Sequence, residues 1–276
     1  MENIFIVKNL VCAYKPDKPV LKISDLHIPN GKLIFLIGKS GIGKSTFIET
    51  LGLMNNTIVD TSETSIRFFP ENTEQGIELK SSWHSSNENL AKLRLDYFSF
   101  IFQNTNLMPN FSAGQNMMAS CLIQGVDVKK AKKDVLQMMQ KLGLEHGIFD
   151  KRVVDLSGGQ QQRLSFVRAA ITDFTVLFGD EPTGNLDEKT AFDLMSILRE
   201  LIRIKGKTCI IVSHDLKLAD KFADVVIPIA KKSTDDGTVY GEIFQHDVIS
   251  RTADTWHDAQ GKPIQDTYSY FSTFLS

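Results

Sequence analysis

The sequence has few cysteines and no long apolar run. Its three cysteines, Cys12, Cys121 and Cys209, are widely separated and lie among apolar residues. This spacing argues against a disulfide framework and a metal site, so we expect reduced thiols, as in a cytosolic protein. No apolar segment approaches the ~18–20 residues that cross a bilayer, and the first residues lack the pattern of a signal peptide. If the protein works at a membrane, another chain is expected to supply the membrane part.

The sequence also lacks an excess of charge of either sign. Its 31 lysines and arginines nearly balance 33 acidic residues, which gives a formal charge of -2. This balance excludes a general attraction to polyanions, so we expect no nucleic-acid partner. At 276 residues the chain exceeds what one compact domain usually needs, which predicts one domain with an insertion or a tail.

What the sequence does contain is a phosphate-binding pattern. An apolar run over residues 33–37 leads directly into Gly38-x-x-x-x-Gly43-Lys44-Ser45, and a helical segment follows. A strand before the loop and a helix after it form the context that this motif requires. The glycines allow successive N–H groups to turn toward phosphate oxygens, and the helix adds its positive end. Lys44 is expected to reach the β- and γ-phosphates, and Ser45 to ligate Mg²⁺. The predicted nucleotide-binding residues of this loop are Gly38, Lys39, Ser40, Gly41, Ile42, Gly43, Lys44, Ser45 and Thr46.

Strand and helix patterns alternate along the rest of the chain. Apolar runs at 97–102, 175–178 and 208–212 predict buried strands, and helical spacing follows Val128 and Asp187. The two methionines 138 and 139 fall on the apolar face of the first helix, which favours core packing. The alternation predicts an α/β fold with a mostly parallel sheet covered on both faces. Residues 4–7 and 20–28, on either side of a turn at 14–19, predict a small antiparallel amino-terminal sheet.

Ligands of such sheets collect at the carboxyl ends of the strands. Four polar residues follow strand ends here: Gln103, Asp180, Glu181 and His214.

A second motif resembles that of a known family. Leu156-Ser157-Gly158-Gly159-Gln160 looks like the signature sequence of ATP-binding-cassette (ABC) ATPases, and it precedes the acidic strand end as in that family. Alone, the pentapeptide is also a sound helix start capped by Ser157. Its occurrence after the phosphate loop favours the signature. The resemblance covers about residues 4–230 and implies a P-loop NTPase fold of the ABC-ATPase type, with a helical signature subdomain at about 104–165.

The resemblance implies roles for the residues at the strand ends. Asp180 resembles the Walker B carboxylate and, with Ser45 and Gln103, is a predicted Mg²⁺ ligand. Glu181 resembles the catalytic carboxylate that polarises the attacking water. Gln103 resembles the Q-loop glutamine and His214 the switch histidine at the γ-phosphate, so that Glu181, His214 and Gln103 are the predicted catalytic residues.

Further predicted nucleotide contacts come from other parts of the chain. Tyr14 is the candidate for stacking on adenine, with Phe5 as the alternative. Asp187 resembles the D-loop aspartate, which reaches across a dimer interface, and it is also a candidate helix cap. In the family, each ATP lies between the phosphate loop of one copy and the signature of the other. The resemblance thus implies ATP and Mg²⁺ as cofactors, a second copy as partner, and contacts to its nucleotide from Ser157, Gly158, Gly159 and Gln160.

Residues 160–163 and 180–187 resemble one branch of the family, that of the lipoprotein-releasing, macrolide-exporting and cell-division cassettes. Members pair with a separate transmembrane permease, so we expect a cytoplasmic protein held at the inner face of the cell membrane by such a partner. Residues 104–118 resemble the surface that receives the permease's coupling helix. A chromosome-structuring ATPase would need a long coiled coil between residues 103 and 156, and a translation factor would need two sets of motifs; neither is present.

The chain departs from the family pattern in two segments. Residues 55–95 are longer and more polar than usual, and we expect most of this stretch to be exposed and loosely packed around one strand at 66–69. Residues 231–276 continue past the usual end and finish with aromatic residues, which indicates docking on the cassette or on a partner. The predicted division is a cassette domain at 1–230 and an extension at 231–276. Both departures leave open an alternative function in a soluble regulatory or immunity complex.

Overall fold

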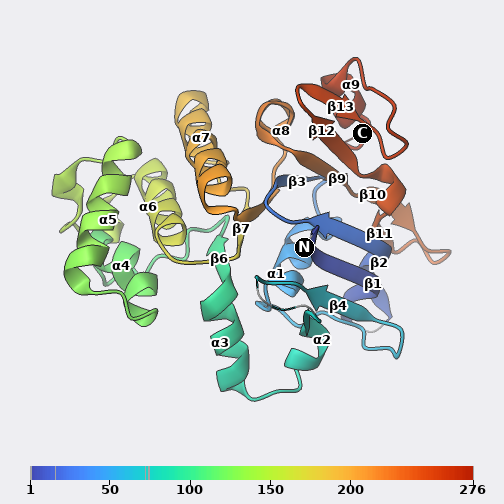
Figure 1. The fold of residues 1–276 in the computed structure, drawn as a ribbon, viewed down its shortest axis with the longest axis horizontal. Coiled ribbons are helices and arrows are strands. Elements are labelled where there is room, and N and C mark those ends of the chain that lie inside the picture. Colours follow the sequence, from blue (N-terminus) through green and yellow to red (C-terminus); the bar gives the residue numbers. More distant parts are fainter. Residues whose placement is uncertain (1, 16, 72, 74, 276) are drawn as a thin grey trace.

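Two β-sheets organise the chain in the computed structural model, which describes residues 2–15, 17–71, 73 and 75–275 (Figure 1). Pro16, in the predicted turn at 14–19, lies outside the described residues. One sheet has the strand order β13 (Thr255–His257), β12 (Ile249–Thr252), β9 (Val225–Pro228), β3 (Leu33–Ile37), β8 (Thr208–Val212), β7 (Val176–Asp180) and β6 (Phe98–Ile101). The other has the order β10 (Ala230–Ser233), β11 (Val239–Ile243), β2 (Lys18–Pro29), β1 (Asn3–Lys15), β4 (Ser65–Phe68) and β5 (Ile77–Glu78).

The seven-stranded sheet is parallel from β9 to β6, while β12 and β13 pair antiparallel at its edge. All residues of β3 and β8 are buried, as expected for strands covered on both faces. Alternate β3 residues face different cores. Leu33, Phe35 and Ile37 pack with the helices, whereas Ile34 and Leu36 pack toward the other sheet. The predicted α/β fold with a mostly parallel sheet is confirmed.

The second sheet is antiparallel except where β11 lies parallel to β2. The predicted amino-terminal antiparallel sheet is therefore present, but its first two strands are longer than the predicted ranges 4–7 and 20–28. β1 has 13 residues and β2 has 12, and they pair from Asn3 with Pro29 to Lys15 with Lys18. The length of β1 is not evident from apolar alternation, because polar residues interrupt it, yet the pairing continues on both sides of Asn9, with Lys8 opposite Asp25 and Leu10 opposite Ile23.

The helices surround the sheets and form one separate arm. The nine α-helices of the described residues are α1 (Lys44–Leu51), α2 (Leu79–Ser82), α3 (Asn87–Tyr97), α4 (Ala113–Ile123), α5 (Val128–Lys141), α6 (Gly158–Ala170), α7 (Glu188–Lys205), α8 (Leu216–Phe222) and α9 (Thr267–Ser272). Helices α4, α5 and α6 make the arm at the left of Figure 1. On α5, Ala131, Val135 and Met139 are buried, so the expected core face is confirmed.

The polar stretch at 55–95 is more tightly packed than we expected. It forms β4, β5, α2 and α3, and Ile66, Phe68 and Leu79 are fully buried. Thr57 and Thr64 are also buried, with Thr57 hydrogen-bonded to Thr50. The expectation of loose packing was wrong for the part around β4 and α2, because isolated apolar residues among polar ones suffice to cover the edge of β1. The expected exposure is found on α3, where Leu90 is the one buried residue among the described residues of that helix.

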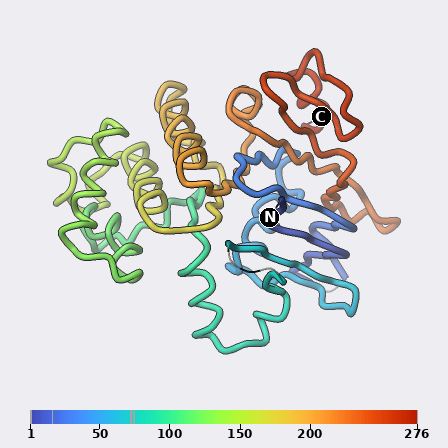
Figure 2. Tube along the Cα trace, in the orientation of Figure 1, coloured from blue at the N-terminus to red at the C-terminus, as the bar shows by residue number. Residues whose placement is uncertain are grey.

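Residues 231–276 extend both sheets. β10 and β11 belong to the six-stranded sheet, β12 and β13 belong to the seven-stranded sheet, and α9 packs against α8. This part of the chain is the red end of the tube in Figure 2. The division of the chain at residue 230 stays a prediction. Among the described residues, no helix has both the length and the apolar character needed to cross a membrane.

Candidate functional site

The phosphate loop lies between the end of β3 and the start of α1. Its glycines adopt left-handed backbone conformations, with φ of 76° at Gly41 and 93° at Gly43. At Gly43 a Cβ would lie 3.0 Å from the Val20 carbonyl oxygen, so the loop also needs a small residue for its close approach to β2. Nothing lies within 4 Å of a Cβ built on Gly41. The loop therefore packs against β2 at Gly43 and has open space for a ligand at Gly41.

Lys44, the first residue of α1, folds back over this loop. Its Nζ donates hydrogen bonds to the carbonyl oxygens of Gly38, at 2.8 Å, and Lys39, at 2.6 Å. Burial lowers the pKa of Lys44, while the charges of Glu181 and Asp180 act in the opposite direction. A cation is thus held against the loop by two of its carbonyl oxygens, where it could share a bound phosphate with the backbone N–H groups.

Three side chains from three strand ends converge beside the loop. Glu181 follows β7, and its Oε2 accepts a hydrogen bond from Gln103 Nε2 at 3.2 Å. Its Oε1 lies 3.0 Å from Nε2 of His214, which follows β8. Because β6, β7 and β8 are adjacent and parallel, their carboxyl ends bring residues 103, 181 and 214 to one place. The predicted clustering of these residues is therefore found.

The backbone of Glu181 is strained. Its φ is 47°, a value uncommon for residues other than glycine. The conformation is fixed by its N–H, which donates to the Val212 carbonyl at 3.0 Å, and by its own carbonyl, which accepts from Gly184 N–H at 3.1 Å. Such strain persists where surrounding contacts determine it and is common at functional sites. Here it directs the carboxylate toward Gln103 and His214.

Asp180 and Ser45 form a second polar pair at the same edge. Burial raises the pKa of Asp180, and a hydrogen bond with the Ser45 side chain opposes that rise. The pair offers a carboxylate and a hydroxyl, the hard oxygen ligands that suit Mg²⁺. The described residues contain no group of three or more His, Cys, Asp and Glu side chains placed for a metal. A cation here would need further oxygens, such as those of a nucleotide.

The signature residues lie at the start of α6. Ser157 caps this helix in a capping box with Gln160, so the helix-start interpretation is confirmed as local structure. Gly158 has open space around it, and Gly159 lies near the loop containing Asn185. No hydrogen bond among the described residues links Ser157 or Gln160 to the phosphate loop. Within one chain, the polar groups of Ser157 and Gln160 are therefore used in their own helix cap rather than on the phosphate loop.

Tyr14 and Phe5, the two candidates for stacking on adenine, differ in exposure. The Tyr14 side chain is 61% exposed, and its hydroxyl lies 3.2 Å from Thr46 Oγ1 beside the phosphate loop. Phe5 is fully buried, 5.1 Å between ring centroids from Phe68. The alternative of stacking on Phe5 is wrong, because that ring belongs to the core.

Asp187 caps α7. Its carboxylate accepts from the N–H and the hydroxyl of Thr190, and the hydroxyl bond is the main cause that lowers the Asp187 pKa. The predicted cap is confirmed. Asp187 is exposed, so it is accessible to a second copy, and the role across a dimer interface stays a prediction.

Two residues outside the predicted set connect the site to the helical arm. Gln162 is buried on α6, and its Nε2 donates at 2.9 Å to the carbonyl of Pro182, next to Glu181. Arg168, also on α6, donates to the carbonyls of Thr105 and Asn106, just after Gln103. The sequence signal for both was only their place in the helix that starts at the signature, since neither follows a strand end.

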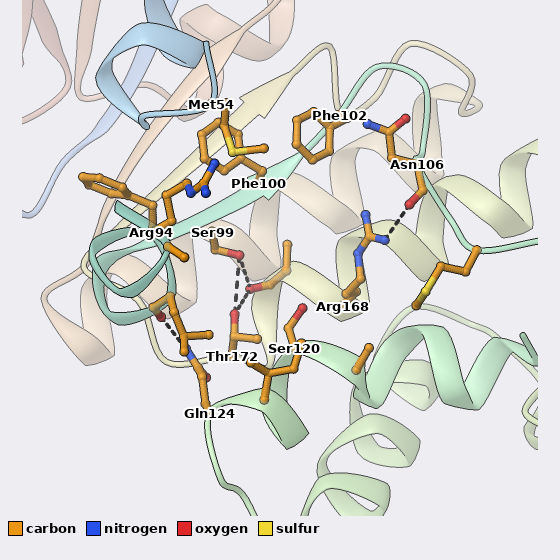
Figure 3. Close-up of a pocket in the computed structure, with 17 residues that line it drawn as sticks. Met54, Arg94, Ser99, Phe100, Phe102, Asn106, Ser120, Gln124, Arg168 and Thr172 are labelled. Atoms are coloured by element: carbon orange, nitrogen blue, oxygen red, sulfur yellow. Dashed lines mark hydrogen bonds between the residues drawn. The ribbon is translucent and has the colours of Figure 1, made fainter. Parts of the chain in front are cut away.

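Arg168 also borders a cavity of about 510 Å³ between the sheet and the arm (Figure 3). Its walls come from α3, β6, α4 and α6, and Figure 3 shows Phe100, Phe102 and Met54 on one side with Ser120 and Gln124 opposite. The Arg168 guanidinium points toward Asn106 at the upper rim, and burial lowers the pKa of Arg168. The cavity therefore lies directly beside the segment that follows Gln103.

A phosphate loop after β3, beside the acidic end of β7 in the same sheet, is typical of a P-loop nucleotide-binding protein. A profile described as "ABC transporter" matches residues 21–184. The chain belongs to the ABC transporter family and is a cassette ATPase of that family.

Similar proteins include two transport components. The chain is 32% identical over 227 residues to the lipoprotein-releasing system ATP-binding protein LolD of Pseudoalteromonas translucida, covering 82% of this chain and 89% of that protein. It is 33% identical over 222 residues to the macrolide export ATP-binding/permease protein MacB of Photorhabdus laumondii, covering 79% of this chain and 32% of that protein.

Solved structures show the same fold. The ATP-binding cassette MJ0796, in a dimeric post-hydrolysis state bound to ADP and Pi, has a TM-score of 0.69 and 27% identity. The alignment covers 81% of this chain and 93% of that cassette.

Proposed function

We propose that this chain is the ATP-hydrolysing subunit of a transporter or force-transmitting complex, and that two copies close on two ATP molecules to drive a separate membrane permease. The observation that carries this proposal is the convergence of Gln103, Glu181 and His214 beside the phosphate loop. Gln103 Nε2 lies 3.2 Å from one carboxylate oxygen of Glu181, and His214 Nε2 lies 3.0 Å from the other. In this arrangement Glu181 polarises the attacking water, and His214 contacts the γ-phosphate. General-base assistance of this kind contributes about 10²–10⁴-fold in rate.

Nucleotide binding is assigned to the loop and to two flanking groups. N–H groups of residues 38–46 and the Lys44 ammonium hold the phosphates, and Tyr14 stacks on the base. Ser45 and Asp180, which share a hydrogen bond, would hold Mg²⁺ together with Gln103. The ion would neutralise charge on the phosphate oxygens when bound.

A second copy is proposed because, among the described residues of one chain, no hydrogen bond links Ser157 or Gln160 of the signature to the phosphate loop. Gly158 is open, and Ser157 and Gly159 stand at a helix start, where N–H groups and the helix dipole favour an anion. Pairing two copies would bring the signature of each to the nucleotide of the other, with Asp187 between them. The dimeric MJ0796 cassette supports this arrangement by its similar fold.

The test of the catalytic proposal compares two variants. Glu181→Gln is expected to keep ATP binding, to lower kcat by about 10²-fold or more and to accumulate the pair of copies. Lys44→Ala is expected to lose tight ATP binding. ATP hydrolysis by Glu181→Gln at the parent rate would show that another group activates the water.

The proposed permease would dock in the cavity of Figure 3, next to the segment after Gln103. Arg168 links this segment to α6, so a partner seated there touches both the Gln103 strand and the signature helix. This would place the protein at the inner face of the membrane through its partner. A mild-detergent pull-down on tagged Glu181→Gln with Mg-ATP tests this: a stoichiometric multi-pass membrane protein is expected, and recovery of soluble partners alone would favour a regulatory complex instead.

A further inference from the structure

A cavity of about 900 Å³ opens between the switch-histidine loop and the carboxyl-terminal helix α9. Its lining includes Thr183 and Leu186 from the loop between β7 and α7, and Tyr268 and Leu275 from the carboxyl-terminal part of the chain. His214 lies on the same lining. Residues near the carboxyl end of the chain therefore line the same cavity as residues that follow β7 and β8.

Helix α9 is firmly attached on its other side. Phe271 is fully buried and packs edge to face on Trp256, with 5.3 Å between ring centroids. The carboxylate of Asp220 on α8 accepts from Thr267 Oγ1 at 2.7 Å and from Trp256 Nε1 at 2.9 Å. Figure 1 shows α8 and α9 together at the upper right. The position of α9 beside the cavity is thus fixed by buried contacts.

The free face of α9 points into the cavity. Tyr268 and Ser272 both line it, and their spacing of four residues places them on one side of the helix, while Leu275 lines it from the turn after α9. The Tyr268 side chain is 53% exposed. A large aromatic side chain that is held in place and half exposed at a cavity rim is the kind of residue that anchors protein interfaces.

The charges around the cavity are compatible with an interface between two copies of this chain. Glu188 at the start of α7 is exposed, and so are Lys217 and Lys221 on α8. A surface that carries both signs at separate points can pair with itself about a two-fold axis, because the carboxylate of one copy then faces an ammonium group of the other. A nucleic acid or an anionic lipid surface would instead favour lysines without the acidic group.

We propose that the second copy packs into this cavity when two chains close on ATP, and that Tyr268 of each chain is buried in the interface. The inference rests on the proposed function, because Leu186 on the cavity lining directly precedes Asp187, which that function places between the copies. The cavity is therefore continuous with the proposed dimer contact. In this arrangement the carboxyl-terminal extension stabilises the ATP-bound pair directly.

The test measures pairing of the Glu181→Gln chain in Mg-ATP by sedimentation. Adding Tyr268→Ala is expected to weaken the pair at least about tenfold, as loss of an interface anchor does, without changing ATP affinity of the monomer. The matched control is Tyr270→Ala on the same helix, since Tyr270 packs on Phe274 and does not line the cavity. The control should pair like its parent. Hydrogen exchange should slow over residues 267–275 only in the pair.

The outcomes separate the two proposals. Equal pairing of the Tyr268→Ala and parent chains, with unchanged exchange over residues 267–275, would overturn this inference and leave the ATP-bound pair intact. Failure of the parent to pair in Mg-ATP would overturn the proposed dimer and this inference with it. Protection of residues 267–275 that requires a membrane partner rather than ATP would assign the cavity to that partner and would also overturn the inference.

Discussion

Glu181 Oε1 and His214 Nε2 lie 3.0 Å apart, although the two residues follow different strands. The contact exists because β7 and β8 are adjacent and in parallel register, with Asp180 opposite Val212. The Glu181 N–H also donates to the Val212 carbonyl. Side-chain and backbone contacts therefore tie the carboxylate to the strand that positions the histidine.

Replacing His214 with alanine should slow hydrolysis more than it weakens binding. The change removes a partner of the Glu181 carboxylate and the proposed contact to the γ-phosphate, so we expect kcat to fall about 10²-fold with the Kd for ATP changed only severalfold. His214→Gln, which retains a hydrogen-bond donor, should recover part of the rate. Single-turnover hydrolysis and nucleotide titration check this, and equal losses in kcat and affinity would contradict it.

Replacing Asp180 with asparagine should raise the stability of the folded protein while abolishing its activity. Burial raises the Asp180 pKa, so the ionised carboxylate destabilises the folded protein at neutral pH, and lowering the pH relieves that cost. The neutral amide removes it at all pH values. Thermal melting without nucleotide should therefore show a Tm a few degrees higher for Asp180→Asn, and Mg²⁺-dependent hydrolysis should be lost. A lower Tm would show that contacts of the carboxylate outweigh its burial.

The affinity for ATP should fall at alkaline pH because of Lys44. Burial lowers its pKa below the usual 10.5, whereas bound phosphates favour the charged form and raise it. Between the two pKa values binding takes up a proton, so the Kd for ATP should rise by up to tenfold per pH unit. Titrations from pH 7 upward measure the onset. In Lys44→Arg, whose guanidinium stays charged, this dependence should disappear, and its persistence would point to another group.

Substitution of a glycine in the extension should weaken nucleotide binding. A Cβ on Gly241 of β11 would lie 2.1 Å from the carbonyl oxygen of Ile42 in the phosphate loop. Gly241→Ala must therefore displace the loop, and we expect the Kd for ATP to rise about tenfold, since misplacement of this kind is costly. Gly147→Ala is the matched control, because nothing lies within 4 Å of its Cβ. Isothermal titration of ATP into both variants measures the two affinities. Equal affinities would mean that β11 moves to accommodate the new Cβ and that the phosphate loop keeps its position.

The motifs made the fold and the convergence of the strand-end residues predictable. Residues 103, 180, 181 and 214 come together because parallel strands end at one edge, a relationship that apolar runs already encode. The contacts of Gln162, Arg168 and Gly241 were not predictable, because each depends on how a helix or strand is placed against a loop far away in the sequence. The burial of residues 57–79 was missed for the same reason, since few apolar side chains carry it.

The position of Gly241 also bears on the order in which the chain is made. Synthesis proceeds from the amino end, so the phosphate loop emerges long before β11, which lies parallel to β2 with Gly241 directly opposite Leu21. Gly43 approaches the same part of β2 from the loop. The surroundings of the phosphate loop are therefore completed only when β11 has left the ribosome. A nascent chain stalled before residue 239 carries the whole motif without its final support.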